Sequence, residues 1–251
     1  MATRPAGRQA ATLRRTPALL LNSRAVGDSD LILQFFTRDE GRISVSARGA
    51  RNSKKRFGGA LEPMHELNLE YEDRGANVDL GVLREAQISR PRLGLVGRLS
   101  ALECAGQALS WTRHALPPRT PEREIWRGCS RLLDALNAAG REAGEVGVDA
   151  VVERRMLGEF GMQLCDALGW GLELDACVSC RRQCPVGQAA GVSPRRGGVV
   201  CRQCGGARRV IRGETRMRLL GVSAGGSLEA ADAEPAIELV EAVLRAHAGL
   251  A

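Results

Sequence analysis

Cysteines are the residues of this chain best able to do chemistry, and four of the eight fall in two closely spaced pairs. Cys177 and Cys180 enclose two residues, and so do Cys201 and Cys204, after a spacer of twenty residues. Each Cys-x-x-Cys pair favours a tight turn that directs both sulfurs to one point, and two turns supply the tetrahedral shell that Zn²⁺ prefers. Because four sulfurs leave no position for a reactive water, the spacing predicts one structural zinc ion without catalytic chemistry.

Two alternatives stay open for these cysteines. The pairs could be ordinary turns with buried or disulfide-linked thiols, although this requires two correctly spaced pairs by chance. Cys184, four residues after Cys180, could replace a ligand, although the two-residue spacing is the better-formed motif. The other cysteines occur singly in helical patterns and are expected to be small core residues: Cys104, Cys129 and Cys165.

The length and composition limit the class of protein. A chain of 251 residues holds one large domain or two to three small ones. It has no run of eighteen apolar residues, and residues 1–12 lack the apolar stretch of a signal peptide, so we expect a cytoplasmic protein without a membrane span. Phosphate-binding loops, dinucleotide fingerprints, nucleophile elbows and deaminase motifs are all missing from the sequence, which predicts that the protein is not an enzyme.

The basic residues are concentrated in two zones. Residues 1–60 hold twelve Lys and Arg against four acids, a net charge of +8, and residues 177–218 hold ten Arg against one acid, a net charge of +9. The intervening and following segments are acidic, so the whole chain carries only +7. Two basic zones separated by acidic segments indicate a polyanion-binding site built from two parts of the chain. A generally soluble, Arg-rich surface is the alternative.

The spacing of apolar residues changes once along the chain. Residues 1–10 have no periodicity and are expected to form a mobile basic arm. Residues 11–88 alternate apolar and polar positions, as Ile43, Val45 and Ala47 illustrate, and turns separate five short strands. Five strands in about 80 residues predict a nucleic-acid-binding barrel of the OB-fold type. The acids Glu70, Glu72 and Asp73 on the edge of one strand are expected to be solvated.

A basic, glycine-rich loop is expected between the third and fourth strands, from Gly49 to Gly59. Its glycines let the backbone approach a ligand, and its cations match phosphate groups. Phe57 could stack on a base or lie in the mouth of the barrel. The predicted DNA-binding residues of both basic zones are Arg14, Arg15, Arg42, Arg48, Arg51, Lys54, Lys55, Arg56, Arg195 and Arg196.

From residue 89 to 251 the period becomes that of helices. The first apolar stripe contains Leu95, Leu99 and Leu109 and stops at Pro117. Further helices are expected from Pro121, over about 149–168 and over 235–248, and a Gly-, Pro- and Arg-rich loop is expected between the cysteine pairs. The expected fold is therefore α+β and multidomain, with an OB-fold barrel over 11–88 and a helical domain over 89–251 that carries a zinc-binding insertion at about 175–210.

The order of these parts resembles the RecO family of recombination mediator proteins. The resemblance covers nearly the whole chain and is most specific over residues 18–88 and 165–205. One departure is Asp28, where the family pattern favours glutamate, and another is the Arg- and Gly-rich spacer before Cys201. The matching segments are Gly27–Asp30, Phe36–Gly41, Ala47–Arg51, Leu61–Pro63 and the four paired cysteines.

The resemblance implies a role in DNA repair. It implies binding of single- and double-stranded DNA, annealing of complementary strands, and recombinase loading together with RecR. The helical residues could also form an apolar groove edged by cations, unless the leucines are core, and the resemblance suggests the acidic tail of single-strand-binding protein as its occupant. The residues of this groove are Leu95, Leu99, Leu102 and Trp111, near Arg98 and Arg113. An RNA- or transcription-associated barrel and a scaffold that binds acidic proteins remain alternatives.

Overall fold

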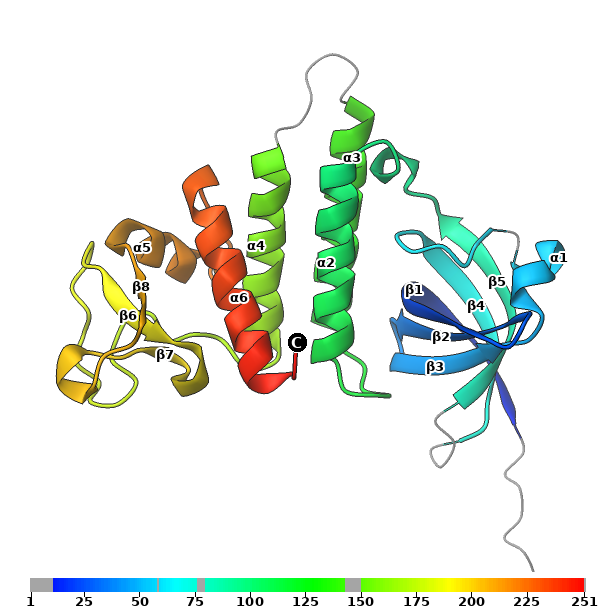
Figure 1. The fold of residues 1–251 in the computed structure, drawn as a ribbon, viewed down its shortest axis with the longest axis horizontal. Helices are drawn as coiled ribbons and strands as arrows, with labels where there is room; N and C mark the ends of the chain where they lie inside the picture. Colours follow the sequence, from blue (N-terminus) through cyan, green and yellow to red (C-terminus); the bar gives the residue numbers. More distant parts are fainter. Residues whose placement is uncertain (1–10, 58, 76–79, 143–149, 251) are drawn as a thin grey trace, which may run out of the picture. The chain divides into compact units, whose positions relative to one another are not determined.

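The computed structural model describes residues 11–57, 59–75, 80–142 and 150–250. The described chain divides into two compact units. Unit 1 runs to Pro91 and also contains the segment Leu116–Arg123, whereas unit 2 contains Arg92–Ala115 and the chain from Glu124 onward (Figure 1). The expected basic arm, residues 1–10, lies outside the described residues.

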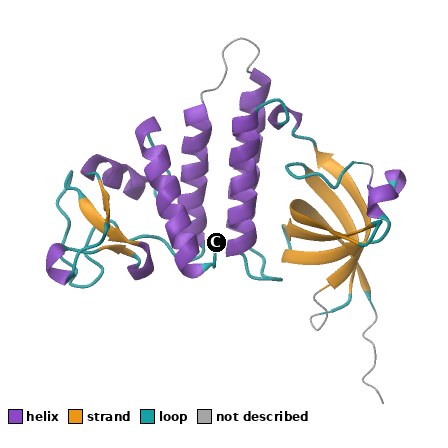
Figure 2. Cartoon of the chain, viewed as in Figure 1, coloured by secondary structure: helices purple, strands orange, loops and turns teal. Residues whose placement is uncertain are grey.

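Unit 1 is a closed five-stranded barrel (Figure 2). Its strands are β1 (Thr12–Val26), β2 (Asp30–Thr37), β3 (Gly41–Ala47), β4 (Glu66–Asp73) and β5 (Leu80–Arg90), in the spatial order β1-β2-β3-β5-β4. The β3–β5 pair is parallel, and the other pairs are antiparallel. The five strands predicted from the sequence are confirmed, although the residues before Leu80 in the last of them lie outside the described part.

Alternation of side chains builds the core of the barrel. In β3 every second residue, Ile43, Val45 and Ala47, is buried, as predicted, and β4 alternates in the same way. Pro17 lies where β1 pairs with β4 but has not yet begun its pairing with β2, so its missing N–H removes no bond on that side. The strand sequences therefore fit a barrel that is apolar inside and polar outside.

The basic loop after β3 folds into two short helical turns, η1 (Ala50–Asn52) and α1 (Lys54–Phe57). Phe57 is only 2% exposed and belongs to the hydrophobic core of the barrel. Of the two alternatives left open for Phe57, the structure therefore supports a place inside the barrel rather than a face on which a base could stack. The guanidinium of Arg56 lies 4.9 Å from the centre of the Phe57 ring.

The segment Leu116–Arg123 packs on the barrel, although it follows a helix of unit 2 in the chain. The Arg119 amide donates to the Arg42 carbonyl at 2.9 Å, and Arg42 Nε donates to the Leu116 carbonyl at 3.0 Å. Gly41 has a φ of +71°, and a Cβ there would lie 2.0 Å from the Thr120 carbonyl oxygen. Only glycine permits this approach, so the sequence of β3 is fitted to a segment about 75 residues away.

Unit 2 contains long helices and a small cysteine-containing module. The helices are α2 (Leu99–Ala115), α3 (Arg123–Glu142), α4 (Ala150–Ala167), α5 (Gly213–Val222) and α6 (Ala233–His247). At Gly161 of α4, a Cβ would lie 2.6 Å from the Trp111 ring and 2.8 Å from Val240, so glycine lets α2, α4 and α6 pack closely. None of the described helices is long and apolar enough to cross a membrane.

The helical periodicity predicts most buried faces correctly, and in the first stripe it predicts Leu95 and Leu109 correctly but not Leu99. The predicted inner residues of α3, including Cys129, are buried, as are Cys104 and Cys165. In contrast, Leu99 is 73% exposed, whereas Leu95 and Trp111 are fully buried. The groove predicted from these leucines and the tryptophan is therefore not formed, because two of its members are core residues.

The spacer between the cysteine pairs is not a simple loop as expected. It contributes β6 (Ala190–Ser193), η3 (Pro194–Arg196) and β7 (Gly198–Val199), and β8 (Arg209–Ile211) follows the second pair. The three strands form a sheet in the order β7-β6-β8. Arg216 of α5 is fully buried and donates to the backbone carbonyls of Leu174, Gln188 and Pro185. This arginine fastens the module to α5 through backbone oxygens.

Candidate metal-binding and nucleic-acid sites

The two Cys-x-x-Cys pairs meet in unit 2. The sulfur atoms of Cys177, Cys180, Cys201 and Cys204 all lie within 4.8 Å of one another. Cys184 is outside this group, and every cysteine is a free thiol, so the pairs are not disulfide-linked. The four sulfurs thus form a compact cluster that could hold a metal ion.

The spacing of the sulfurs can be compared with a metal site. Sulfurs bound at about 2.3 Å around a tetrahedral Zn²⁺ are about 3.8 Å apart. The sulfurs of Cys180 and Cys201, one from each pair, are 3.7 Å apart. This sulfur pair therefore has the separation of a tetrahedral thiolate site, and the other sulfurs of the cluster lie within 4.8 Å.

Backbone hydrogen bonds change the pKa of one of these thiols in the direction that favours metal binding. The amides of Cys201, Cys180 and Ser179 donate to Cys177 Sγ and lower the pKa of that thiol to about 5. Hydrogen bonds of the protonated Cys204 thiol with Cys201 and Cys180 raise the pKa of Cys204 to about 12, because the four sulfurs lie close together. A divalent cation at that point would favour the thiolate form of each ligand. The donor set therefore fits a structural metal ion.

The basic loop of the barrel is held by the turn before β2. Asp30 Oδ1 accepts the Gly49 amide at 2.8 Å, and this bond holds the pKa of Asp30 below its usual range. The Arg51 amide donates to the Ser29 carbonyl at 3.1 Å, and Arg51 Nη1 donates to the Asp28 carbonyl at 3.2 Å. Two motifs far apart in the sequence thus meet, and together they fix the backbone of the basic loop.

The predicted DNA-binding arginines differ in their surroundings. Arg48, Arg51 and Arg56 are exposed on the basic loop, and Arg56 Nη2 donates to the Arg48 carbonyl at 2.6 Å. Arg15 forms an ion pair with Glu70 at 2.6 Å. The side chains of Lys54 and Lys55 lie outside the described part of the structure. The loop therefore presents cations to solvent, whereas part of the charge on β1 is neutralised.

Arg14 and Arg42 bond to other residues of the barrel unit. Arg42 holds the Leu116–Arg123 segment, and Arg14 pairs with Asp73 at 3.2 Å and with Glu40 at 3.6 Å. In the cysteine module, Arg195 and Arg196 are exposed on η3, and Arg196 donates to Ser179 and to the Cys204 carbonyl. Arg14 and Arg42 therefore link parts of the barrel, whereas Arg195 and Arg196 are exposed on the cysteine module.

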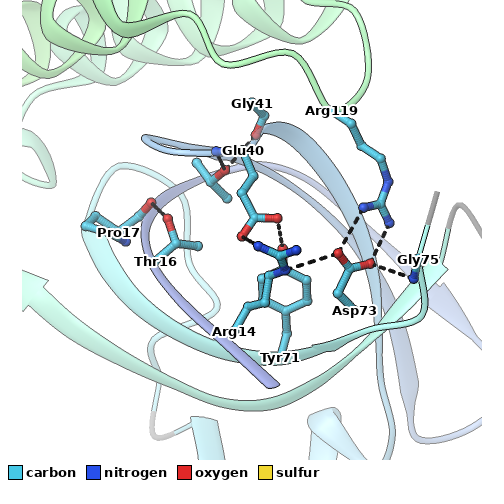
Figure 3. Close-up of polar contacts among 10 residues, drawn as sticks. Arg14, Thr16, Pro17, Glu40, Gly41, Tyr71, Asp73, Gly75 and Arg119 are labelled. Atoms are coloured by element: carbon cyan, nitrogen blue, oxygen red, sulfur yellow. Dashed lines mark hydrogen bonds and ion pairs between the residues drawn. The ribbon is translucent and has the colours of Figure 1, made fainter. Parts of the chain in front are cut away.

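Asp73 is the centre of a polar network at one end of the barrel (Figure 3). Arg119 donates to both of its carboxylate oxygens, at 3.0 and 3.2 Å, and the Gly75 amide donates at 3.1 Å. The Tyr71 hydroxyl donates to Glu40 at 2.6 Å. Asp73 is buried, so the prediction that it is a solvated strand-edge charge is wrong. The sequence offered no signal that an arginine 46 residues later would reach it.

We expect Asp73→Asn to destabilise the barrel by about 1–3 kcal/mol at neutral pH, because the variant weakens the charged hydrogen bonds to Arg119. Burial acts to raise the pKa of Asp73, but the Arg119 and Gly75 bonds outweigh it and hold this pKa below its usual range. The stabilisation is therefore present above the unfolded pKa, about 3.9, and is lost as pH falls through the lower folded value. The difference between wild type and variant should shrink below about pH 4.

Thermal or urea unfolding at several pH values measures this effect. The single tyrosine lies in the barrel and all three tryptophans lie in unit 2, so their near-ultraviolet signals report the two units separately. Asp39→Asn is the control, because the exposed Asp39–Arg38 pair is worth less than about 1 kcal/mol. Equal effects of the two substitutions would contradict a stabilising role for the network.

Comparison with known proteins assigns the chain to a family. The family model "Recombination protein O N terminal" matches residues 12–92, and "Recombination protein O C terminal" matches residues 97–249. This chain belongs to the RecO family. A DNA repair protein RecO of Rubrobacter xylanophilus is 34% identical over 193 residues, which cover 76% of this chain and 71% of that protein. Another DNA repair protein RecO, from Anaeromyxobacter sp. strain K, is 32% identical over 235 residues, which cover 89% of this chain and 87% of that protein.

The family supports a role in DNA repair and recombination for this chain. The resemblance noted from the sequence motifs is therefore confirmed. Its members are described as DNA repair proteins, and the five-stranded unit and the helical unit correspond to the two matched regions. The motif segments Gly27–Asp30 and Ala47–Arg51 are hydrogen-bonded to each other, and these bonds fix the start of the basic loop.

A hollow that the sequence did not predict lies between α3 and α4. Its volume is about 470 Å³, and its lining includes Gly128, Phe160 and Leu164. Arg127 and Arg131, both exposed, are one turn apart on α3 and also line it. The sequence shows the i, i+4 spacing of the two arginines, but it does not show which residues of α4 pack opposite them.

Proposed function

We propose that this protein is a non-catalytic recombination mediator that binds single- and double-stranded DNA, anneals complementary strands and, with RecR, helps to load recombinase. The observation that carries the proposal is the group of exposed arginines Arg48, Arg51 and Arg56, which follow β3 of a closed barrel and whose loop is held by Asp30. Neutralising phosphates on two strands lowers their repulsion and releases counterions, which favours annealing without any catalytic group. DNA binding would place the protein at the nucleoid.

We further propose that the barrel is an OB-fold and that the cysteine cluster holds one zinc ion. The closed strand order and the parallel β3–β5 pair support the first assignment. The sulfur separation and the four-thiolate donor set support the second. Cys177, Cys180, Cys201 and Cys204 would hold the ion, and with its shell closed the ion would stabilise the module rather than react. The exposed Arg195 and Arg196 would add phosphate contacts.

The acidic tail of single-strand-binding protein is the partner we propose for the α3–α4 hollow. Phe160 and Leu164 supply an apolar base, and Arg127 and Arg131 supply positive charge at its side. Glu124 and Asp166 also line the hollow, so the tail's carboxylates would be drawn to the arginine side. This site replaces the groove predicted from the first helical stripe.

One annealing experiment tests both parts of the proposal. The wild type should accelerate pairing of naked complementary strands and of strands coated with single-strand-binding protein. Arg127→Glu/Arg131→Glu should keep the first activity and lose most of the second, because the tail is repelled. Arg245→Glu, which reverses an exposed charge on α6 and does not line the hollow, is the control.

The alternatives give different outcomes. A protein scaffold for acidic partners would leave naked strands unpaired. An RNA- or transcription-associated module would bind RNA at least as tightly as DNA of equal length and would not anneal. Either result would contradict the mediator function.

A further inference from the structure

The cysteine module contains a hollow of about 570 Å³ beside the four sulfurs. Small residues create it, because Ala190, Gly191, Gly206 and Ala207 leave space that longer side chains would fill. At Gly191, a Cβ would already lie 3.1 Å from the Ala207 amide nitrogen. The volume is within the range of pockets that enclose small organic ligands, roughly 300–1,000 Å³.

The chemistry of the lining is specific. Val199 and Val200 are buried apolar residues of the lining, and Val210 is a third valine, 66% exposed. The exposed side chains of Arg182 and Arg202 supply two cations, and none of the described lining residues carries a carboxylate.

Other hollows in the described structure are different. The one between α3 and α4 includes Glu124 and Asp166, and the one on β1, β4 and β5 includes Glu70 and Glu85. The hollow of the cysteine module therefore combines an apolar surface with uncompensated positive charge. Two amide side chains, Gln183 and Gln188, add donors and acceptors.

We propose that this hollow receives one unpaired base of single-stranded DNA, while Arg182 and Arg202 contact the phosphates that flank it. The inference rests on the proposed DNA-binding function and adds a base site to it. An apolar slot accepts the face of any base, and the two amides can bond to base edges. Because a paired base cannot enter, the site would distinguish single strands from duplex.

Filling the hollow tests this inference. Ala189 is exposed and lines the hollow, so Ala189→Leu adds bulk there without a buried clash. With the full-length, zinc-loaded protein, we expect this variant to lose roughly 5-fold in affinity for a thymidine oligonucleotide, since burying one face of a base against apolar side chains contributes about that factor. Affinity for a duplex of equal length should not change. Ala224→Leu, which adds the same bulk on an exposed turn elsewhere, is the control.

A second measurement separates the base from its phosphates. An oligonucleotide that lacks bases should bind wild type and Ala189→Leu equally, whereas Arg182→Gln/Arg202→Gln should weaken its binding. Arg208→Gln, an exposed arginine of the module that does not line the hollow, is the single-charge control. Zinc content measured on every variant shows whether the module is intact.

The results would decide between the inference and the proposed function. If wild type binds single strands but Ala189→Leu binds them equally well, or loses affinity for single strands and duplex alike, the base site is wrong and the DNA-binding function stands. If wild type binds no DNA, both are wrong. Selective loss for single strands that have bases would support the site.

Discussion

Replacing Arg48, Arg51 and Arg56 together by glutamine should reduce the salt dependence of DNA binding more than any other change in the barrel. Each phosphate contact contributes about 0.7 to the slope of log K against log salt for single strands and about 0.9 for duplex. Three lost contacts should therefore lower the slope by about two to three. Because phosphate contacts carry no sequence information, the loss should be the same for different sequences.

The structure offers a control with the same loss of charge. Arg15, Arg38 and Arg84 are also exposed on the barrel, but each is ion-paired with a neighbouring acid. Replacing these three by glutamine should change the slope much less. Titrations at several salt concentrations measure both variants, and equal slopes would mean that position on the loop is irrelevant.

The cysteine module can be compared in the same titrations. Neutralising Arg195 and Arg196 should lower the slope by up to about two if both touch phosphate. Combined with the loop variant, it should remove nearly all binding at moderate salt if the two basic zones act on one DNA. An unchanged slope for Arg195→Gln/Arg196→Gln would restrict phosphate binding to the barrel and leave these arginines to a partner or to solubility.

Cys201→Ser should remove the bound metal and unfold the module that surrounds it. The wild type should hold one zinc ion per chain, and the variant should hold little or none, because one of the four sulfurs of the cluster is lost. Structural zinc binding is coupled to folding and supplies on the order of 10 kcal/mol in small zinc domains. The melting temperature of unit 2 should therefore fall together with the metal content.

Cys184→Ser is the matched control, because Cys184 is a neighbouring thiol outside the cluster. It should keep the zinc and most of the stability. Metal analysis and thermal unfolding followed by tryptophan signals check both variants. Full zinc retention in Cys201→Ser, with loss in Cys184→Ser, would overturn the assignment of ligands.

Local periodicity explains which features could be predicted from the sequence. Alternation such as Ile43, Val45 and Ala47 identifies a half-buried strand wherever it occurs, and the two-residue spacing of the cysteines is itself local. The positions of Phe57 and Trp111 are different, because an aromatic residue beside arginines reads equally well as a binding surface or as core. Tertiary packing decides between these, and here it buries both residues.

Long-range contacts account for the remaining errors. Asp73 looks like a surface charge until Arg119, which has a φ of +55°, reaches it from the segment after α2. No residue near Asp73 in the sequence indicates that Arg119 is its partner. Leu99 differs from its expected position in the other direction, because its spacing predicts a buried residue but its side chain is exposed. It is the first residue of α2.

The segment Leu116–Arg123 has a consequence for how the protein is made. Unit 1 is interrupted in the chain by Arg92–Ala115, which belongs to unit 2. As a ribosome synthesises the protein from the N-terminus, all five strands emerge before the arginine that pairs with Asp73. The barrel is therefore completed only after α2 has been made, and until then Asp73 has its bonds to Arg14 and the Gly75 amide but lacks both bonds from Arg119. A fragment that stops at Pro91 would remain in that unfinished state.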